Sequence, residues 1–469
     1  MKILSFLILF ILSFSSNLQS QNWTEPVNVS NMNDFILNCD FTIDNTGIIH
    51  CVWSLKYSAN YGVIYYAKSE DDGLTWTEPV SVSQNINYYC TNPQIVHDSQ
   101  NNLYVGYDLN DYSPQTWGSY ACLVKKDSAG WGLPLTLSEG IDTRLAVDKN
   151  DRIYIFWYQG SPHSGEFCYQ YLEGMEWSSI FCPFDNQGKT YLNEVVVDSI
   201  NNLHGVGVHD SLSFLNDHTC YYYFDYQSNQ WANIVDLSIG TTNRDNDIAL
   251  DTDQNPHIIW EEYKTLYSWF DGASWALTDT ISFKNTYRVV IEVDKSNNIH
   301  LASTEDNGGG INLMYYYQFD GINWESMIVD HGNNVIFTPE FEIFNNQLYV
   351  VYDKSNSVPY GDIFISKLEL LSTTFEYNNS LGGEIQMQNV PNPFSGTTKI
   401  RYNLENEATI QLNIYNYTGQ LIKSIDEGTQ PKGTHFIEFD ANGLKDGVYL
   451  YSIFVNGKKT DSEKMTIMK

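Results

Sequence analysis

The residues that could carry chemistry recur at one place relative to a repeated turn. Four residues before the turn aspartate, or before Phe344 in the last copy, the chain has Asp40, Gln94, Arg144, Glu194, Asp247 and Glu340. The sixth copy has Val290 there and Arg288 two residues earlier. Carboxylates accept hydrogen bonds and can act as general acid and base, and arginine pairs with anions. The pattern predicts a polar ring that binds a ligand, and in an alternative reading Asp40, Glu194 and Asp247 serve a hydrolase or lyase that acts on glycans.

Other candidate constellations are better explained as scaffold. Six residues after the turn aspartate the second strand carries His50, His204, His257 and His300, with Tyr104, Tyr154 and Tyr349 at the equivalent places. Four histidines could suggest a metal ring, but equivalent positions on successive repeats lie apart and tyrosine replaces histidine freely, so we expect packing residues. The stretch DTDQN (251–255) lacks the later glycine and glutamate of a calcium loop. Glu261 and Glu262 point to opposite faces of a strand. We therefore expect no metal and no cofactor.

The element that must position these residues is a β-hairpin that the chain repeats seven times. Each copy is a short apolar strand, a turn rich in Asp, Asn and Gly, and a second strand. The copies are FTIDNTGIIHCVW (41–53), QIVHDSQNNLYVGY (94–107), LAVDKNDRIYIFW (145–157), VVVDSINNLHGVG (195–207), IALDTDQNPHIIW (248–260), IEVDKSNNIHLAS (291–303) and FEIFNNQLYVVY (341–352).

A Tyr-rich strand, a tight turn and a strand with a tryptophan follow most of the hairpins. The aligned tryptophans are Trp76, Trp131, Trp177, Trp231, Trp275 and Trp324. Four strands in about 50 residues is the size of a propeller blade. The sequence thus predicts an all-β chain whose residues 21–376 form a seven-bladed β-propeller, with the tryptophans filling the gaps between blades.

The seventh unit lacks a Trp strand, and the start of the chain holds a candidate to replace it. WTEPVNVS (23–30) matches WTEPVSVS (76–83) at seven of eight positions. We expect the N-terminal segment to supply the outer strand of the last blade, which would close the ring and remove an open sheet edge.

The polar ring should lie at one rim of the central channel, beside the long and dissimilar loops of that face. Variable loops on a rigid scaffold are the usual place for binding. Aromatic residues in these loops, Tyr112 and Trp117 together with Tyr57, Tyr61 and Tyr158, could stack on sugar rings or pack on a protein. We expect the ring residues to be solvated, so that changing them weakens binding and leaves the fold intact.

Composition limits the function classes. With a formal charge of -32 over 469 residues, the chain has no basic patch for nucleic acid. Residues 1–20 read as a secretory signal peptide, because Lys2 precedes an apolar run from Ile3 to Phe14 that is too short to span a bilayer. We expect no transmembrane segment in the mature chain. The cysteines are odd in number, and we expect buried free thiols at Cys39, Cys51, Cys90, Cys122, Cys168, Cys182 and Cys220.

One motif resembles a known family of propellers. SEDDGLTW (69–76) is similar to the Asp-box on the blades of sialidases. The resemblance implies the blade plan, with the Asp and Gly serving a tight turn. It does not extend to the sialidase arginine triad, because the only propeller arginines are Arg144, Arg152, Arg244 and Arg288. Sialidase activity is therefore not expected, and non-enzymatic binding is favoured.

The end of the chain resembles a second family. After a linker over 377–388, residues 389–469 read as a small β-sandwich with alternating strands and Gly and Pro turns. This segment resembles the C-terminal sorting domain of the type IX secretion system of Bacteroidetes. The residues that carry the resemblance are Pro391, Asn392, Pro393, Phe394, Gly419, Gly447, Tyr449, Lys464 and Lys469. It implies Sec export through the periplasm, contact with the type IX machinery, and secretion or display on the outer cell surface. The propeller would then bind a glycan or protein ligand at its rim.

Overall fold

The computed structural model of the chain is built from β-strands, and no α-helix occurs in the part that it describes. Consistent with this, the same part offers no helix of the length and apolar character that a membrane crossing requires. The structure describes residues 23–32, 34–58, 60–83, 88–113, 118–160, 165–184, 188–210, 217–238, 245–276, 278–306, 312–319, 324–330, 335–357, 360–370, 387–390, 392, 394, 396–404, 406–416, 421–445 and 447–467.

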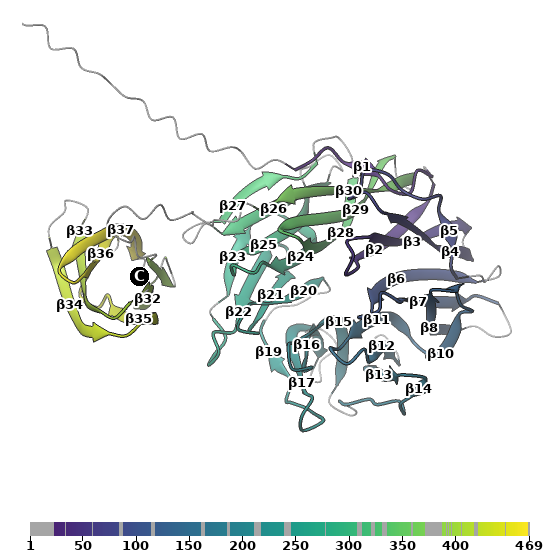
Figure 1. The fold of residues 1–469 in the computed structure, drawn as a ribbon, viewed down its shortest axis with the longest axis horizontal. Helices are drawn as coiled ribbons and strands as arrows, with labels where there is room; N and C mark the ends of the chain where they lie inside the picture. The colour runs from purple at the N-terminus through teal and green to yellow at the C-terminus, as the bar shows by residue number, and fades with distance from the viewer. Residues whose placement is uncertain are drawn as a thin grey trace, which may run out of the picture.

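The first thirty strands form antiparallel groups, which we number 1 to 7 in chain order, and Figure 1 shows them arranged around a common centre. The innermost strands are β2 (Ile36–Ile43), β6 (Tyr89–His97), β11 (Ile141–Val147), β15 (Lys189–Val197), β20 (Asn246–Leu250), β24 (Thr286–Val293) and β28 (Val335–Phe344). The second strands are β3 (Ile49–Ser58), β7 (Leu103–Asp111), β12 (Ile153–Gln159), β16 (Leu203–Asp210), β21 (Pro256–Glu261), β25 (Ile299–Asp306) and β29 (Gln347–Ser357).

The third strands are β4 (Tyr61–Ser69), β8 (Gly118–Asp127), β13 (Glu166–Glu173), β17 (His218–Asp225), β22 (Thr265–Trp269), β26 (Asn312–Phe319) and β30 (Tyr360–Glu369). The outer strands are β5 (Val80–Ser81), β9 (Gly130–Trp131), β10 (Leu135–Glu139), β14 (Glu176–Trp177), β18 (Gln230–Trp231), β19 (Val235–Asp236), β23 (Asp279–Ser282), β27 (Trp324–Ile328) and, from the start of the chain, β1 (Val27–Asn28). Each inner strand contacts the inner strand of the next group, and β28 contacts β2.

The N-terminal strand β1 pairs with β30 of group 7. Val27 lies opposite Ile365 and Asn28 opposite Phe364. The amide of Thr24 donates to the carbonyl of Lys367 at 2.9 Å, which extends the pairing before the strand. The start of the chain therefore supplies the outer strand of group 7, as the repeated octapeptide predicts.

Tryptophans from the outer strands pack each group against the group before it. The ring centroids are 5.0 Å apart for Trp131 and Tyr66, 5.8 Å for Trp231 and Tyr169, 5.1 Å for Trp275 and Tyr221, 5.5 Å for Trp324 and Tyr267, and 5.5 Å for Trp23 and Tyr316. All are edge-to-face pairs, an arrangement that the ring quadrupoles favour. The buried apolar side chains of groups 1 to 7 accordingly form clusters that two successive groups share.

The aligned histidines are packing residues with a definite hydrogen-bond role. In four groups the Nδ1 atom contacts a tyrosine hydroxyl of the third strand at 2.6–2.8 Å: His50 with Tyr66, His204 with Tyr221, His257 with Tyr267, and His300 with Tyr316. Nε2 of each ring faces the turn aspartate of its own hairpin at 3.2–3.6 Å. The contact of Nε2 with the aspartate is a hydrogen bond in His50 and His204, and a longer electrostatic contact at 3.6 Å and 3.5 Å in His257 and His300.

Side chains link successive hairpin turns. The amide that follows the turn aspartate donates to a side-chain oxygen of the next turn: Asn45 to Asn101, Ser99 to Asp151, Lys149 to Asn201, Ser199 to Gln254 and Thr252 to Asn297, at 2.7–3.2 Å. All five acceptor residues have positive φ, between 61° and 73°. Asn and Asp tolerate this conformation better than other side chains do. A glycine there would give up the acceptor.

The link differs between groups 7 and 1. Gly47 holds the place of the acceptor residue in the first turn, with φ at 89°. A Cβ added to Gly47 would lie 3.2 Å from Cε1 of Phe344, the residue that replaces the turn aspartate in group 7. An aromatic contact thus stands where the other turns have a hydrogen bond. We call this contact the seam.

The polar atoms of the turn in SEDDGLTW form hydrogen bonds within the turn. Oδ1 of Asp71 accepts from the amide of Thr75 at 2.8 Å, and the amide of Gly73 donates to Oγ of Ser69 at 2.9 Å. Nε1 of Trp76 donates to the carbonyl of Gly73 at 3.2 Å. Nearby, Asp72 pairs with Lys367 of group 7. These contacts agree with a scaffold role for the turn.

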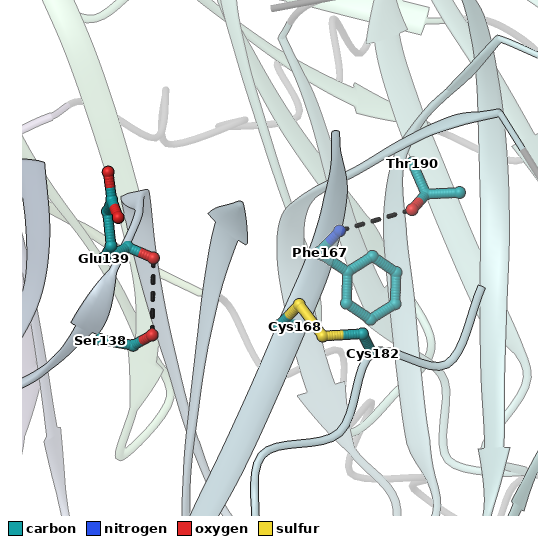
Figure 2. The surroundings of a disulfide bond; sticks show 6 residues. All are labelled: Ser138, Glu139, Phe167, Cys168, Cys182 and Thr190. Atoms are coloured by element: carbon teal, nitrogen blue, oxygen red, sulfur yellow. Dashed lines mark hydrogen bonds between the residues drawn. A yellow bond between two sulfur atoms is a disulfide. The ribbon is translucent and has the colours of Figure 1, made fainter. Parts of the chain in front are cut away.

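One expectation about the cysteines is wrong. Cys168 on β13 and Cys182, which follows β14, form a disulfide across 14 residues (Figure 2). Tyr169 and Phe181 exchange backbone hydrogen bonds, and this bridge brings the two sulfurs together. Such short-range register cannot be read from cysteine spacing. The other cysteines, Cys39, Cys51, Cys90, Cys122 and Cys220, are buried free thiols, as expected.

The C-terminal strands form a small sandwich of two sheets. One sheet has the order β31 (Met387–Val390), β32 (Thr397–Leu404), β35 (Gly433–Asp440), and the other β34 (Leu421–Gln430), β33 (Ala408–Asn416), β36 (Gly447–Val455), β37 (Lys458–Ile467). Ile400 and Phe439 of the first sheet share a buried core with Leu412 and Ile453 of the second. The strand β31 begins two residues before the predicted domain start at 389.

We expect the N-terminal strand to be essential for stability. Deleting residues 23–30 removes the pairing with β30 and the Trp23 ring, and it exposes a sheet edge. Trp23→Ala alone should lower the free energy of unfolding by up to about 3–5 kcal/mol, the cost of emptying a fully buried aromatic site, since the Trp23 ring is partly buried. Thermal unfolding followed by circular dichroism measures both. An unchanged melting temperature for the deletion would refute the role of β1.

Stability should also depend on the protonation of His50. Burial lowers the pKa of His50 to about 4, although Asp44 opposes the shift. An unfolded histidine titrates near pH 6.5, so His50 stabilises the fold above that pH and the contribution of about 3 kcal/mol is lost as pH falls towards 4. Gln can replace both hydrogen bonds without titrating. Urea unfolding of His50→Gln should therefore be less acid-sensitive than wild type from pH 6.5 to 4, and parallel curves would contradict the assignment.

Candidate functional site

The inner strands share a local irregularity next to the polar ring. The pairing register shifts immediately before the ring position in β6, β11, β15 and β28, one residue earlier in β2, and immediately before Arg288 in β24. Four polar residues close to these shifts, Asn38, Asn92, Asp142 and Thr338, have positive φ between 36° and 57°. Bulges re-aim side chains and are common beside functional sites, and positive φ in non-glycine residues is costly. The irregularity sets the direction of the ring residues.

Three ring residues join neighbouring inner strands. Oδ2 of Asp40 accepts from the amide of Ile95 at 2.7 Å, and Oε1 of Gln94 accepts from the amide of Leu145 at 2.7 Å. In the same way Oδ2 of Asp247 accepts from the amide of Ile291 at 2.8 Å. Each side-chain oxygen thus accepts a hydrogen bond from a backbone N–H of the next group, and that amide needs no water as a partner.

These contacts correct the expectation that the ring is merely solvated. Asp40, Gln94 and Asp247 are only partly exposed, and their oxygens bind backbone amides. Arg144 likewise donates to the carbonyl of Asn193 in group 4. Removing such groups leaves a partner without a hydrogen bond, so changes at the ring affect stability as well as any ligand.

Five of the predicted residues interact with one another across the centre. Nε2 of Gln94 donates to Oε2 of Glu194 at 3.0 Å, which joins group 2 to group 4. Burial, and then the charge of Glu194, raises the pKa of Asp40 to about 7, against hydrogen bonds from Ile95 and Phe41. Burial and the charges of Asp40, Asp247 and Glu194 raise the pKa of Glu340 well above its ordinary value.

The electrostatic balance of the ring is acidic with one cation. Burial and the charge of Glu194 raise the pKa of Asp247. Arg144 stays protonated, because Tyr191, Glu194 and further acidic neighbours outweigh the burial that would lower its pKa. Carboxyl groups in this state can both donate and accept hydrogen bonds. The arrangement suits hydroxyl-bearing or cationic groups better than a ligand with several negative charges.

Two inner-strand glutamates were missed from the sequence. Oε1 and Oε2 of Glu342 both accept from the amide of Ile43 at 3.0 Å, which joins group 7 to group 1. Burial raises the pKa of Glu292 to about 7. Each lies two residues after the ring position of its strand, between apolar residues. A glutamate between apolar residues, as in IEV and FEI, was the available signal.

Other predicted residues lie away from the ring. Arg288 pairs with Asp245 near the surface. Tyr112 is 39% exposed and lies 6.3 Å from the Tyr89 ring, whereas Tyr158 is buried with its hydroxyl accepting from the amide of Gly165. Tyr57 stacks on Tyr61 with centroids 5.3 Å apart. The remaining candidate, Trp117, lies outside the described residues.

The sorting residues bring the two ends of the C-terminal sandwich together. The side chain of Asn392 donates to the carbonyl of Lys464 at 3.0 Å and accepts from the amide of Thr466 at 2.7 Å. Phe394 is buried beside Phe439. Gly447 begins β36 with φ at 143°, and the hydroxyl of Tyr449 donates to the carbonyl of Lys445 at 3.0 Å. Pro391, Pro393, Gly419 and Lys469 lie outside the described residues.

The ring's structural contribution can be measured at Gln94. Group 6 has valine at the equivalent position, so Gln94→Val is sterically matched to the scaffold. It leaves the amide of Leu145 without its acceptor, and we expect a loss of about 1–3 kcal/mol in urea unfolding. Tyr112→Ala, a change at an exposed aromatic residue away from the polar ring, should cost at most about 0.5 kcal/mol. Equal stability of the two variants would contradict the joining role.

Comparison with known proteins identifies the C-terminal domain. Residues 390–468 match the family described as the secretion system C-terminal sorting domain. The chain therefore carries a type IX secretion sorting domain, which implies export to the cell surface or into the medium and contact with the type IX machinery. No curated protein matches the chain in sequence.

Solved structures resemble the chain in fold. A protein of unknown function from Dyadobacter fermentans is 10% identical, covers 74% of this chain and 99% of its own, and has a TM-score of 0.48. Trypanosoma rangeli sialidase in complex with sialic acid is 10% identical, with 96% and 89% covered and a TM-score of 0.46. The K499G mutant of NanB sialidase from Streptococcus pneumoniae is 11% identical, with 74% and 70% covered and a TM-score of 0.45. These likenesses concern the arrangement of strands and say nothing of activity.

Proposed function

We propose that the protein is an exported seven-bladed β-propeller, closed by its N-terminal strand, that binds a glycan or protein ligand at the rim of the central channel, where the polar ring lies. The proposal includes residues 1–20 as a signal peptide, Sec passage through the periplasm and an Asp-box turn in group 1. The shared clusters between successive groups, the contact of β28 with β2 and the pairing of β1 with β30 support the closed ring.

One observation carries the binding proposal. Strand after strand departs from regular pairing directly before the ring, and four polar residues there adopt positive φ. A regular strand would hold the groups together without this cost. Repeated strain at one face is expected where side chains must be aimed at a ligand.

The disulfide supports the proposed route. Cys168 and Cys182 are bonded, and disulfides persist in the periplasm and outside the cell. An alternative activity at the same face is hydrolysis or elimination in a glycan, with Asp40 as a proton donor. Its pKa of about 7 favours that alternative, because a general acid works best near the operating pH.

A glycan array and a surface-protein pull-down with the secreted protein test the proposal. The variant Arg144→Ala with Glu194→Gln should bind its ligand at least about tenfold more weakly, the loss expected for charged hydrogen bonds. His204→Ala should lower stability and leave the affinity of the folded fraction unchanged. Wild-type affinity in the double variant would exclude the ring as the site. Released oligosaccharide products would establish the hydrolytic or eliminative alternative.

A further inference from the structure

Three exposed aromatic residues lie near the start of the inner strand β24, in groups 5 and 6. Tyr263 is 68% exposed, Phe283 85% and Tyr287 40%. Several large aromatic side chains exposed close together are typical of a binding site, because contact between apolar surface and water is unfavourable. Neither Phe283 nor Tyr263 is among the aromatics that repeat between groups, so blade packing does not explain them.

These residues gather around one buried contact. Oγ1 of Thr265 lies 3.0 Å from Oγ1 of Thr286, and both side chains are buried. Thr265 is paired with Ser282, which precedes Phe283. Tyr263 lies two residues before Thr265, and Tyr287 follows Thr286. Since a chain spans at most about 3.6 Å per residue, the backbones of the three aromatics lie close together where groups 5 and 6 meet.

The patch rests on a fixed support. Nζ of Lys284 lies 3.8 Å from the centre of the Tyr315 ring and 3.3 Å from Oε2 of Glu305. Glu305 is fully buried and also accepts from the hydroxyl of Ser303 at 3.0 Å. These contacts fix the segment that carries Phe283 and Tyr287. Ligand binding therefore costs little conformational entropy in this segment.

The polar surroundings of the patch hold acceptors as well as two cations, Lys284 and Arg288, each of which is paired with a carboxylate. The amide of Tyr263 donates to Oε1 of Glu261 at 3.3 Å, and the amide of Glu261 donates to the carbonyl of Asp245. Asp245 pairs with Arg288, the residue that follows Tyr287, so the patch lies next to this predicted binding residue. Acceptors around aromatic rings suit a ligand whose own groups are hydroxyl donors.

The geometry points to a platform of Tyr263, Phe283 and Tyr287 on which an uncharged polysaccharide stacks its sugar rings. This assignment rests on the proposed function and names its ligand class. Lys284 and Arg288 are already paired with Glu305 and Asp245, and the chain charge of -32 disfavours an anionic glycan. A protein partner is disfavoured because the exposed apolar residues here are all aromatic, whereas exposed aliphatic residues such as Leu133, Leu135, Met175 and Ile180 lie on groups 2 and 3.

The test is binding of the full-length secreted protein to defined polysaccharides. Sedimentation with insoluble cellulose and chitin, and affinity electrophoresis in laminarin, xylan and mannan, give the affinities. Phe283→Ala and Tyr263→Ala should each weaken binding to the retained polysaccharide at least tenfold. Leu133→Ala and Met175→Ala are matched controls, 82% and 96% exposed on groups 2 and 3, and should bind within twofold of wild type. Unchanged melting temperatures show that every variant is folded.

The outcomes separate the platform from the wider proposal. Wild-type affinity in Phe283→Ala and Tyr263→Ala, with loss in Arg144→Ala plus Glu194→Gln, would overturn the platform and keep the ring as the site. Retention by none of the five polysaccharides would overturn the uncharged-glycan assignment. Stronger retention by polygalacturonate or hyaluronan than by the neutral probes would overturn it as well.

Discussion

The contact between a tryptophan of one group and a tyrosine of the preceding group is the interaction on which much of this fold depends. Tyr316 illustrates it, because its ring meets Trp23 and its hydroxyl meets Nδ1 of His300. His300 in turn faces Asp294, the residue that closes its hairpin turn. One buried side chain thus joins packing between groups to the hydrogen bonds within a hairpin. The spacing of successive groups follows, and with it the placement of the polar ring.

The repeat architecture could be predicted because its signals are local. Turn aspartates, aligned tryptophans and the copied octapeptide all lie within short stretches, and the pairing of Val27 with Ile365 follows from them. The role of the histidines was also accessible, since tyrosine at the same place argues for packing. The sorting domain was recognisable from Asn392 and Phe394, whose contacts with β37 bring the two ends of the motif together.

The candidate site was less accessible because it depends on irregular backbone. A period of two residues cannot reveal the register shift before Gln94, and that shift turns its side chain towards the next strand. Glu342 was overlooked for the same reason. Exposure was also hidden, since Tyr158 and Tyr263 look alike in the sequence although one is buried and the other 68% exposed. Whether a ring is covered depends on residues distant in the chain.

At the centre, the residues proposed to bind a ligand also hold the inner strands together. Asp40 and Asp247 hold neighbouring strands through backbone amides, so they have little freedom to change for a ligand. Glu194 differs, because it reaches across to Gln94 as well as binding its own backbone at Val195. Specificity can therefore vary more easily at the periphery, where Tyr263 and Phe283 are largely exposed, than at the ring.

The seam between groups 7 and 1 has a consequence for how such genes can change. Because β1 completes group 7, the boundaries of the coding repeat are out of phase with the boundaries of the structural groups. Duplication or loss of one internal repeat would leave Gly47, Phe344 and the N-terminal strand untouched, so every intermediate gene would still encode a matched pair of ends. The N-terminal strand and group 7 act as a clasp, and the stretch between them is free to lengthen, shorten or diverge.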